Sequence, residues 1–230
     1  MKIAWAMTNY GPIFTPVYTS HLSAAVSAAR RFEVLQLGSI GSIDGTDRMY
    51  THSAENNVVQ NFLDTDATHL FMTECDMILP DDTLVKLASH DYDAVCGLYF
   101  LRGGDGQPCL YKKVVTTREN PWVHSPVSIF PTEELFPIDC PGLGCVLFKR
   151  KVFETLEHPW FDLKEGKYGS DMFFYTNFKK AGLKLMCDPT VRCDQIEYVV
   201  VGFKDYENRL KNDPKYAARG YIVPSRAINE

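Results

Sequence analysis

The sequence predicts an α/β fold with a mostly parallel central sheet flanked by helices. Apolar runs alternate with helix-like periodic segments through the first hundred residues, which is typical of a parallel sheet covered by helices. The chain has 230 residues, 45% of them hydrophobic, so it is long enough to bury a substantial core. One apolar run, residues 69–73, stops at Glu74 and Asp76. In an open α/β sheet, such a strand end is where ligands bind.

The predicted strands of the first half are short apolar runs at residues 2–7, 32–37, 69–73 and 94–100. Glycine, serine and aspartate residues after the second run mark turns. Helical segments separate the four runs, so we expect neighbouring strands to run parallel.

The helices are predicted from a 3.6-residue period and from capping signals. We expect them at 21–31, at 54–63 and from 80 to about 89. Pro80 and the two aspartates after it suit a first helical turn, because acidic groups favour the positive end of the helix dipole. The expected core faces are Leu22, Val26 and Ala29 in the first helix and Val58, Val59, Phe62 and Leu63 in the second.

The second half of the chain is less regular. Residues 102–139 contain several glycines and prolines and only one predicted strand, at 110–115, which is typical of a functional loop region. Beyond them we expect a glycine-bearing strand at 142–148, helices at 149–156, 168–181 and 206–210, and a strand at 183–187. Gly182 is the expected C-cap of the 168–181 helix. Its expected core face is Phe173, Phe174, Phe178 and Ala181.

Charge and composition argue against several functional classes. The net charge is −5 and no basic run is present, so neither nucleic acid nor an anionic membrane is a predicted partner. No apolar run approaches the length of a membrane span, and the first residues lack the apolar region and cleavage site of a signal peptide. The seven cysteines are odd in number and scattered, which favours reduced thiols in the cytoplasm and argues against a structural zinc site.

Glu74 and Asp76 are the first candidate site. Alternate side chains of a strand point the same way, so these two carboxylates can face one ligand together. They repel each other unless a positive charge lies between them. A divalent cation with a bound diphosphate explains the pair, since hard cations take oxygen ligands and bridge phosphates. A polar loop that follows a strand explains it equally well.

A second candidate site opens the 168–181 helix with Gly169, Ser170 and Asp171. An acidic residue at a helix start complements the dipole, so Asp171 has a purely structural explanation. The functional alternative is a general base that removes a proton from an acceptor hydroxyl.

Four stretches in this order resemble a known enzyme family. They are 69–80 with Glu74-Cys75-Asp76, 94–102 with Tyr99 and Arg102, 142–153 followed by 159–161, and 169–174 followed by 181–185. From residue 64 to 189 the chain resembles GT-A glycosyltransferases, and within them the small glycosyltransferase-like proteins of viral and bacterial genomes related to the family 2 enzymes. The resemblance implies a GT-A-like, Rossmann-like sheet with a smaller acceptor-side subregion.

The resemblance also implies a reaction. A sugar would move from a nucleotide-diphosphate donor, a UDP- or GDP-sugar, to a hydroxyl of a glycan or another acceptor. Mn²⁺ or Mg²⁺ would bridge the diphosphate, with Asp76 as metal ligand and Glu74 in contact with the metal or the donor ribose. Asp171, at the position of the family's catalytic aspartate, would be the base of an inverting displacement.

Further contacts follow from the same resemblance. Thr8 and Tyr10 lie where such folds hold the nucleotide, and Tyr10 would stack on the base. Arg48 lies where relatives often have an arginine near the donor phosphates. The expected acceptor-side residues are Gly144, Trp160 and Ser170. The aromatic residues and the arginine also have a structural explanation, as packing groups or surface charge.

The chain departs from the family pattern at three positions. Glu74 replaces the first aspartate of the metal motif, and Ser170 replaces the glutamate that usually precedes the catalytic aspartate. Where many relatives have a metal-binding histidine, this sequence has Asp194 and Gln195. Asp194 is an acceptable ligand for a hard cation, and Gln195 or water are the alternatives.

We expect a single domain over residues 1–230. Its nucleotide-sugar half would reach to residue 100, its acceptor and catalytic half would cover 101–200, and a helix and tail would follow to 230. Two other functions remain open: a sugar-nucleotide-binding pseudoenzyme without turnover, and a nucleotidyltransferase. The second would normally have a glycine-rich basic loop after its first strand, which residues 9–12 resemble poorly. The resemblance to viral proteins also agrees with a virus-encoded chain in the host cytoplasm.

Overall fold

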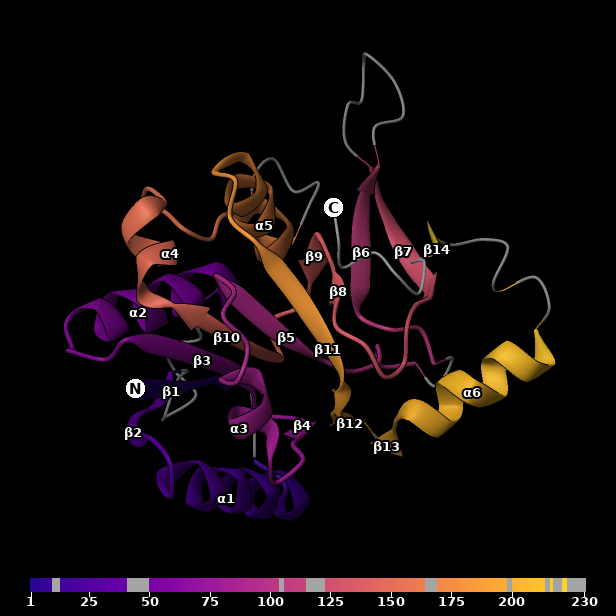
Figure 1. Ribbon diagram of the computed structural model, residues 1–230, viewed down its shortest axis with the longest axis horizontal. Coiled ribbons are helices and arrows are strands. Elements are labelled where there is room, and N and C mark those ends of the chain that lie inside the picture. Colours follow the sequence, from indigo (N-terminus) through magenta and orange to yellow (C-terminus); the bar gives the residue numbers. More distant parts are fainter. Residues whose placement is uncertain are drawn as a thin grey trace.

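A mixed sheet of seven strands forms the centre of the structure (Figure 1). This computed structural model describes residues 1–9, 13–40, 50–103, 106–114, 123–163, 169–197, 200–213, 216 and 221–222. The strand order is β2-β1-β3-β10-β5-β11-β8. The bounds are β1 (Lys2–Thr8), β2 (Glu33–Ile40), β3 (His69–Glu74), β5 (Ala94–Leu98), β8 (Phe136–Pro137), β10 (Cys145–Lys149) and β11 (Leu185–Arg192).

The sheet is largely parallel, as predicted, but one central strand runs the other way. β1 pairs in parallel with β2 and β3, and β5 pairs in parallel with β11. β10 lies between β3 and β5 and is antiparallel to both. Its first residue, Cys145, pairs with Thr73 near the end of β3. The glycine-bearing segment before β10 therefore lies at the same edge of the sheet as Glu74.

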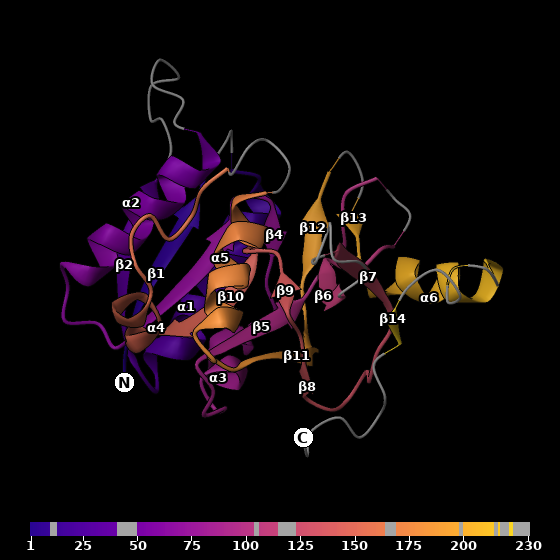
Figure 2. The same cartoon turned by 90° about the horizontal axis from the view of Figure 1, so that it is seen from above.

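Helices cover both faces of this sheet (Figures 1 and 2). α2 (Thr51–Leu63), α4 (Arg150–Thr155) and α5 (Ser170–Lys180) lie on one face, and α1 (Thr15–Ala29) and α3 (Thr83–Leu87) lie on the other. Successive residues of β3 contribute to the two faces in turn. Leu70 and Met72 belong to the core under α2, α4 and α5, whereas Phe71 packs in the core under α1 and α3. This is the alternation expected of a strand covered on both sides.

In α1, small side chains face the sheet, so the predicted core face was wrong. Leu22 and Val26 are 53% and 51% exposed. The helix also begins earlier than predicted, with a proline in its first turn. The Nε2 atom of His21 lies 2.9 Å from the carbonyl oxygen of Met77. Because small residues face the sheet, the helix lies close to it, and the larger side chains point to solvent. The buried residues of α1 are Val17, Ala24 and Ala28.

The predicted face of α5 is partly confirmed. Phe174 and Phe178 are buried, but Phe173 is only half-buried and Ala181, just after the helix, is exposed. Gly182 follows with a φ of +72°, the left-handed conformation expected of a C-cap.

Two smaller sheets flank the edge of the central sheet. One has the order β13-β12-β4 and the other β14-β7-β6-β9. The helix α6 (Phe203–Asn212) lies beside the second of them, at the right of Figure 1, and stacks Tyr206 on Phe130. The sequence predicted β6 but not β7, β8 or β9. The bounds are β4 (Met77–Ile78), β6 (Leu110–Val114), β7 (Val123–Ile129), β9 (Cys140–Pro141), β12 (Asp194–Ile196), β13 (Val200–Val201) and β14 (Tyr221–Ile222).

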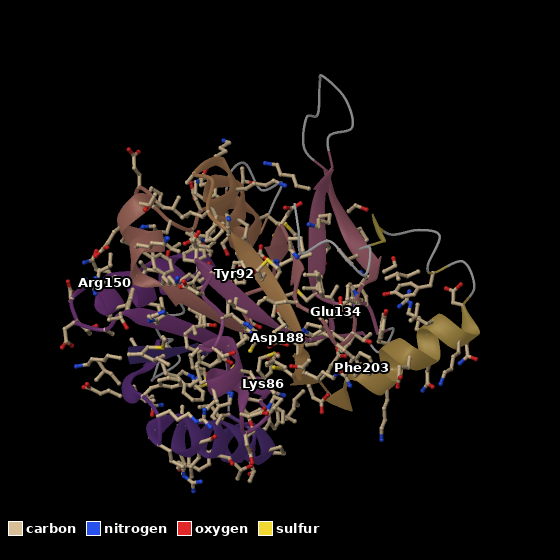
Figure 3. The ribbon with its side chains drawn as sticks, in the orientation of Figure 1. Lys86, Tyr92, Glu134, Arg150, Asp188 and Phe203 are labelled. Carbon is tan, nitrogen blue, oxygen red and sulfur yellow. The ribbon has the colours of Figure 1, made fainter. Side chains whose placement is uncertain are left out.

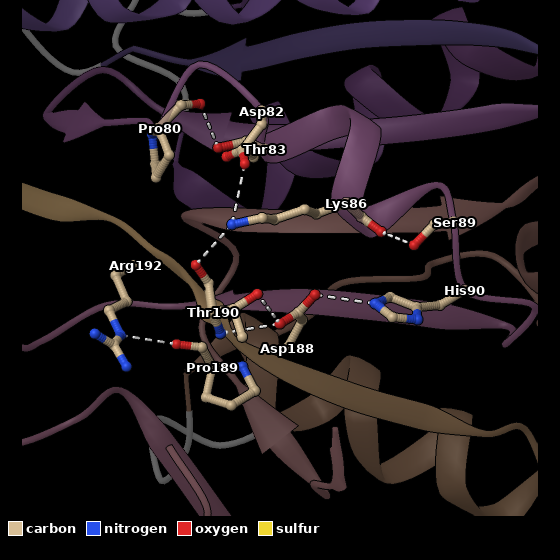
Figure 4. A network of polar contacts seen from close by, with 10 residues as sticks. All are labelled: Pro80, Asp82, Thr83, Lys86, Ser89, His90, Asp188, Pro189, Thr190 and Arg192. Atoms are coloured by element: carbon tan, nitrogen blue, oxygen red, sulfur yellow. Dashed lines mark hydrogen bonds and ion pairs between the residues drawn. The ribbon is translucent and has the colours of Figure 1, made fainter. Parts of the chain in front are cut away.

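A register shift in β11 directs the chain toward the end of β3. Asp188 pairs with Gly97, but the next residue of β5 pairs only with Arg192. Figure 4 shows the polar network at this shift. One oxygen of Asp188 accepts hydrogen bonds from the Thr190 backbone and hydroxyl, at 2.9 and 2.7 Å, and the other lies 2.9 Å from His90 Nε2. These contacts fix the bulge, and the chain beyond it forms β12 beside β4.

None of the helices in the described ranges has the length and hydropathy needed to cross a membrane. All seven cysteines are buried, and none of them forms a disulfide bond.

Candidate active site

A cavity of about 510 Å³ lies where β3 ends, β10 begins and α5 begins. The helix α2 and the strand β12 close two further sides. Its wall contains acidic groups, one tyrosine and several leucines. The lining residues are Thr51, Glu55, Glu74, Tyr99, Leu101, Arg102, Cys109, Gly142, Leu143, Leu163, Gly169, Ser170, Asp171 and Gln195. Three predicted site residues, Glu74, Ser170 and Asp171, thus come together in one cavity.

Asp76 lies in the turn between β3 and β4 and contacts two residues of the cavity wall. Its Oδ2 accepts a hydrogen bond of 3.1 Å from Gln195 Nε2 and lies 3.5 Å from Arg102 Nη1. Its Oδ1 is buried and has no hydrogen-bond partner among the described residues. An unpartnered buried carboxylate oxygen costs about 1–3 kcal/mol, so a ligand that satisfied it would bind favourably.

Glu74, at the end of β3, faces the cavity beside Asp76. Burial and, after it, repulsion by Asp76 raise the pKa of Glu74 to about 7, while Arg102 acts in the opposite direction. A cation between the two carboxylates would remove this repulsion. Carboxylate oxygens are the ligands that a hard cation prefers, so Glu74 and the unpartnered Oδ1 of Asp76 are the candidate ligands, although Asp76 itself does not line the cavity.

Asp194 does not line this cavity, although the sequence suggested it as a metal ligand. Its carboxylate lies against Gly202, at the start of α6, where a Cβ would overlap with it. Burial and the nearby Asp205 raise the pKa of Asp194. Neighbouring residues of β12 point to opposite sides, so Gln195 reaches the cavity instead. In the described part of the chain, no three His, Cys, Asp or Glu side chains form a group that could hold a metal ion.

Asp171 enters the cavity from the first turn of α5. Its Oδ1 accepts a hydrogen bond of 2.7 Å from the Met172 backbone. Burial raises the pKa of Asp171, and this hydrogen bond opposes the effect. A carboxylate with a raised pKa is a stronger base than an exposed one, so the environment of Asp171 suits proton removal.

Glu55, on α2, is the fourth acidic group near the cavity, and the sequence analysis missed it. The residue is only 4% exposed. Its Oε2 has no partner in the described ranges, and its carboxyl is hydrogen-bonded to the Ser170 side chain. Burial raises the pKa of Glu55 to about 8; the Ser170 contact lowers it, and the charges of Asp171 and Glu74 add to the rise.

The sequence did contain a signal for Glu55. The residue lies three, four and seven positions before Val58, Val59 and Phe62, which are buried. An acidic residue on the apolar face of a predicted helix is unusual, because burial of a carboxylate without a partner is costly.

The two glycines before β10, Gly142 and Gly144, let the backbone lie close to Tyr99. A Cβ at Gly142 would overlap with the Tyr99 hydroxyl, and a Cβ at Gly144 would lie 3.0 Å from the ring. The Tyr99 hydroxyl accepts a hydrogen bond of 3.3 Å from the Gly144 N–H. Gly144 therefore holds Tyr99 in the wall, but it does not line the cavity itself.

Trp160 is a core residue and does not line the cavity. Its indole N–H donates to the carbonyl oxygens of Phe153 and Leu156, at 3.1 Å each. The Trp160 backbone N–H donates to Asn56 Oδ1 at 2.9 Å. Asn56 follows Glu55 in α2, so the Trp160 segment fixes the helix that positions Glu55.

Arg150 holds the other end of α2. This residue is labelled at the left of Figure 3, at the start of α4. Its guanidinium donates to the carbonyl oxygens of Leu63 at 2.8 Å and Thr65 at 2.9 Å. It thereby satisfies groups that a helix leaves unpaired at its C-terminus. α2 is fixed by this contact and by Asn56.

The remaining predicted donor contacts lie outside the cavity or outside the described residues. Thr8 is buried at the end of β1, paired with Glu74, and its carbonyl oxygen accepts the Cys75 N–H at 3.1 Å. It supports the end of β3 but does not line the cavity. Tyr10 and Arg48 lie outside the described residues.

Comparison with solved structures shows a fold shared with a viral protein. The chain superposes on protein A197 from STIV with a TM-score of 0.57 and 18% sequence identity, over 86% of each chain. This likeness supports the GT-A-like fold expected from the sequence. No family model and no curated protein sequence matches the chain.

Two further solved structures match with lower similarity. The inositol-1-phosphate CTP transferase from T. maritima has a TM-score of 0.39 and 9% identity, over 91% of this chain and 96% of that one. S. aureus TarS 1-349 has a TM-score of 0.42 and 13% identity, over 81% of this chain and 58% of that one.

Proposed function

We propose that this chain is a glycosyltransferase that moves a sugar from a nucleotide-diphosphate donor to an acceptor hydroxyl. The observation behind this proposal is the cavity in which Glu74, Asp171 and Glu55 meet, with the free Oδ1 of Asp76 behind its wall. A GT-A-like fold agrees with the proposal but does not by itself assign an activity.

Glu74 and Asp76 form the donor end of the proposed site. They would hold Mn²⁺ or Mg²⁺, which when bound would offset the negative charge of the diphosphate. Gln195 orients Asp76 through its amide, and Arg102 adds a positive charge beside the same carboxylate. Since the described residues offer two carboxylates at this end of the site, oxygens of the donor and water would complete the shell of the ion. A UDP- or GDP-sugar is the donor class that fits this arrangement.

Asp171 forms the acceptor end. In the proposed inverting displacement, the acceptor oxygen forms a bond to the anomeric carbon while the bond from that carbon to the diphosphate oxygen breaks. The hydroxyl proton moves to Asp171, and the electron pair of the broken bond leaves with the diphosphate. The Met172 N–H keeps Asp171 oriented, and burial makes its carboxylate a better base.

The cavity wall suits a sugar between these two ends. Leu101, Leu143 and Leu163 offer apolar surface for the C–H faces of a sugar ring, while Tyr99 and the carboxyls offer polar contacts. The seven buried thiols further suggest that the protein works in a reducing compartment, and we propose the cytoplasm.

Titration calorimetry with UDP-glucose and GDP-mannose, with and without Mn²⁺, tests this function. We expect at least one of the two to bind only when Mn²⁺ is present, and Asp76→Ala to remove that binding. Asp81→Ala, which removes an exposed aspartate five residues away, is the matched control and should bind as the wild type does. Absence of nucleotide-sugar binding to the wild type would overturn the proposal. Binding with neither transfer nor donor hydrolysis would instead identify a binding protein without turnover.

A further inference from the structure

Glu55 is a buried acidic residue for which the fold offers no structural role. It is the fifth residue of α2, so it does not cap the helix. Within the described ranges, no basic side chain forms an ion pair with it, and the charges that act on it, Asp171 and Glu74, are of the same sign. An apolar side chain would pack beside Val58 and Val59 without this penalty.

The Glu55 carboxyl is nevertheless held in a defined position. Ser170, at the start of α5, forms a hydrogen bond with it. The side chains of Asn56 and Arg150 hold α2 in place through hydrogen bonds to backbone groups of other segments and of the helix end. One carboxyl oxygen is thus engaged by the protein, whereas Oε2 is buried without a partner in a residue that lines the cavity. Such an arrangement prepares a group for a ligand, because buried polar atoms are otherwise almost always hydrogen-bonded.

The ligand group that Oε2 would meet is a hydroxyl rather than a metal ion. Glu55, Glu74 and Asp171 do not form a group that could hold an ion, in the part of the chain that the structure describes. Burial raises the pKa of Glu55 to about 8, so its carboxyl is mostly neutral at pH 7 and can both donate and accept hydrogen bonds. Sugar hydroxyls do the same, and the leucines of the wall suit the remainder of a sugar ring.

We infer that Glu55 recognises the sugar bound in this cavity, by a hydrogen bond from its free carboxyl oxygen to a sugar hydroxyl, and that Ser170 positions Glu55 for this contact. This inference rests on the proposed function only in naming the sugar as part of the donor or of the acceptor. The contact between Glu55 and a sugar hydroxyl does not depend on it. The sugar is the transferred residue of the nucleotide donor or a sugar of the acceptor, and two sets of probes distinguish the two sources.

The first probes are UDP-glucose and GDP-mannose, each compared with its free nucleoside diphosphate in the presence of Mn²⁺. If Glu55 contacts the donor sugar, Glu55→Leu should weaken the binding of the nucleotide-sugar about tenfold or more, and that of UDP or GDP less than about twofold. Glu55→Gln keeps the length and the hydrogen-bonding capacity of the side chain and should lose less affinity. Glu157→Ala removes an exposed glutamate and should match the wild type.

The second probes are methyl hexopyranosides, observed by saturation-transfer NMR without nucleotide. If Glu55 contacts an acceptor sugar, saturation transfer to at least one of them should be seen with the wild type and lost in Glu55→Leu, while nucleotide-sugar affinity stays unchanged. Unchanged binding of both kinds of probe in Glu55→Leu would overturn the inference. A wild type that binds methyl glycosides but no nucleotide-sugar would overturn the proposed function alone, and a wild type that binds no sugar at all would overturn both.

Discussion

Gln195, on β12, donates a hydrogen bond of 3.1 Å to Asp76 across a sequence separation of 119 residues. The contact joins the turn after β3 to a strand that belongs to a different sheet. It leaves Asp76 Oδ1 as the free, buried oxygen that a cation would meet. The orientation of the proposed metal ligand therefore depends on a residue that is distant in the sequence but adjacent in the fold.

Replacement of Gln195 by leucine should weaken Mn²⁺-dependent binding of the nucleotide-sugar about 10- to 100-fold, which is the usual effect of removing a group that orients a metal ligand. Asp194→Asn should leave the affinity within about twofold of the wild type, because the Asp194 carboxylate lies against Gly202. Titration calorimetry at fixed Mn²⁺ concentration measures both. If Asp194→Asn weakened binding more than Gln195→Leu, Asp194 would instead be the third ligand of the metal ion.

Replacement of Glu55 by leucine should raise thermal stability, and more so at high pH. The folded chain holds a proton on Glu55 up to about pH 8, whereas the unfolded chain releases it near its ordinary pKa of about 4.3. Since the folded state then binds more protons, the free energy of unfolding of the wild type falls as pH rises through this interval. Leucine does not titrate, so this contribution is absent in the variant.

Thermal unfolding from pH 5 to pH 8 without metal measures this difference. The melting temperature of Glu55→Leu minus that of the wild type should increase steadily across the range, whereas Glu157→Ala should follow the wild type. Parallel curves for wild type and Glu55→Leu would show that Glu55 is not a buried neutral carboxyl.

Replacement of Gly142 by alanine should destabilise the fold by about 1–3 kcal/mol, because the new Cβ would overlap with the Tyr99 hydroxyl. Gly144→Ala should cost less, since its nearest contacts would be at 3.0 Å. Urea unfolding of Gly142→Ala, Tyr99→Phe and the double variant provides a double-mutant cycle. The loss of the hydroxyl should recover part of the cost of Gly142→Ala, and strict additivity would contradict the packing described here.

The sequence predicted the core of the fold because local signals there agree with tertiary structure. β1, β3, β5 and α2 are apolar or periodic segments with clear ends, and all four formed where expected. The direction of β10 was not predictable, since an apolar strand looks the same in either direction. β8 and β9, with two residues each, are too short to give a period.

The candidate site was predictable where a side chain's direction follows from its own element. Glu74 at a strand end and Asp171 at a helix start both reach the cavity. The choice between Asp194 and Gln195 depends instead on how β12 pairs with β4, which in turn depends on the bulge held by Asp188. Trp160 could be a cavity or a core residue from its sequence, and only the partners of its indole N–H decided the matter.

The most direct test of the proposed reaction is the Asp171→Asn variant, assayed with the donor that binds most tightly. The asparagine keeps the shape of the side chain but cannot accept the acceptor's proton. We expect donor affinity within about twofold of the wild type and transfer, or donor hydrolysis, reduced about 10²- to 10⁴-fold. Turnover equal to that of the wild type would contradict the assignment of Asp171 as the general base, and with it the two-ended site proposed for this cavity.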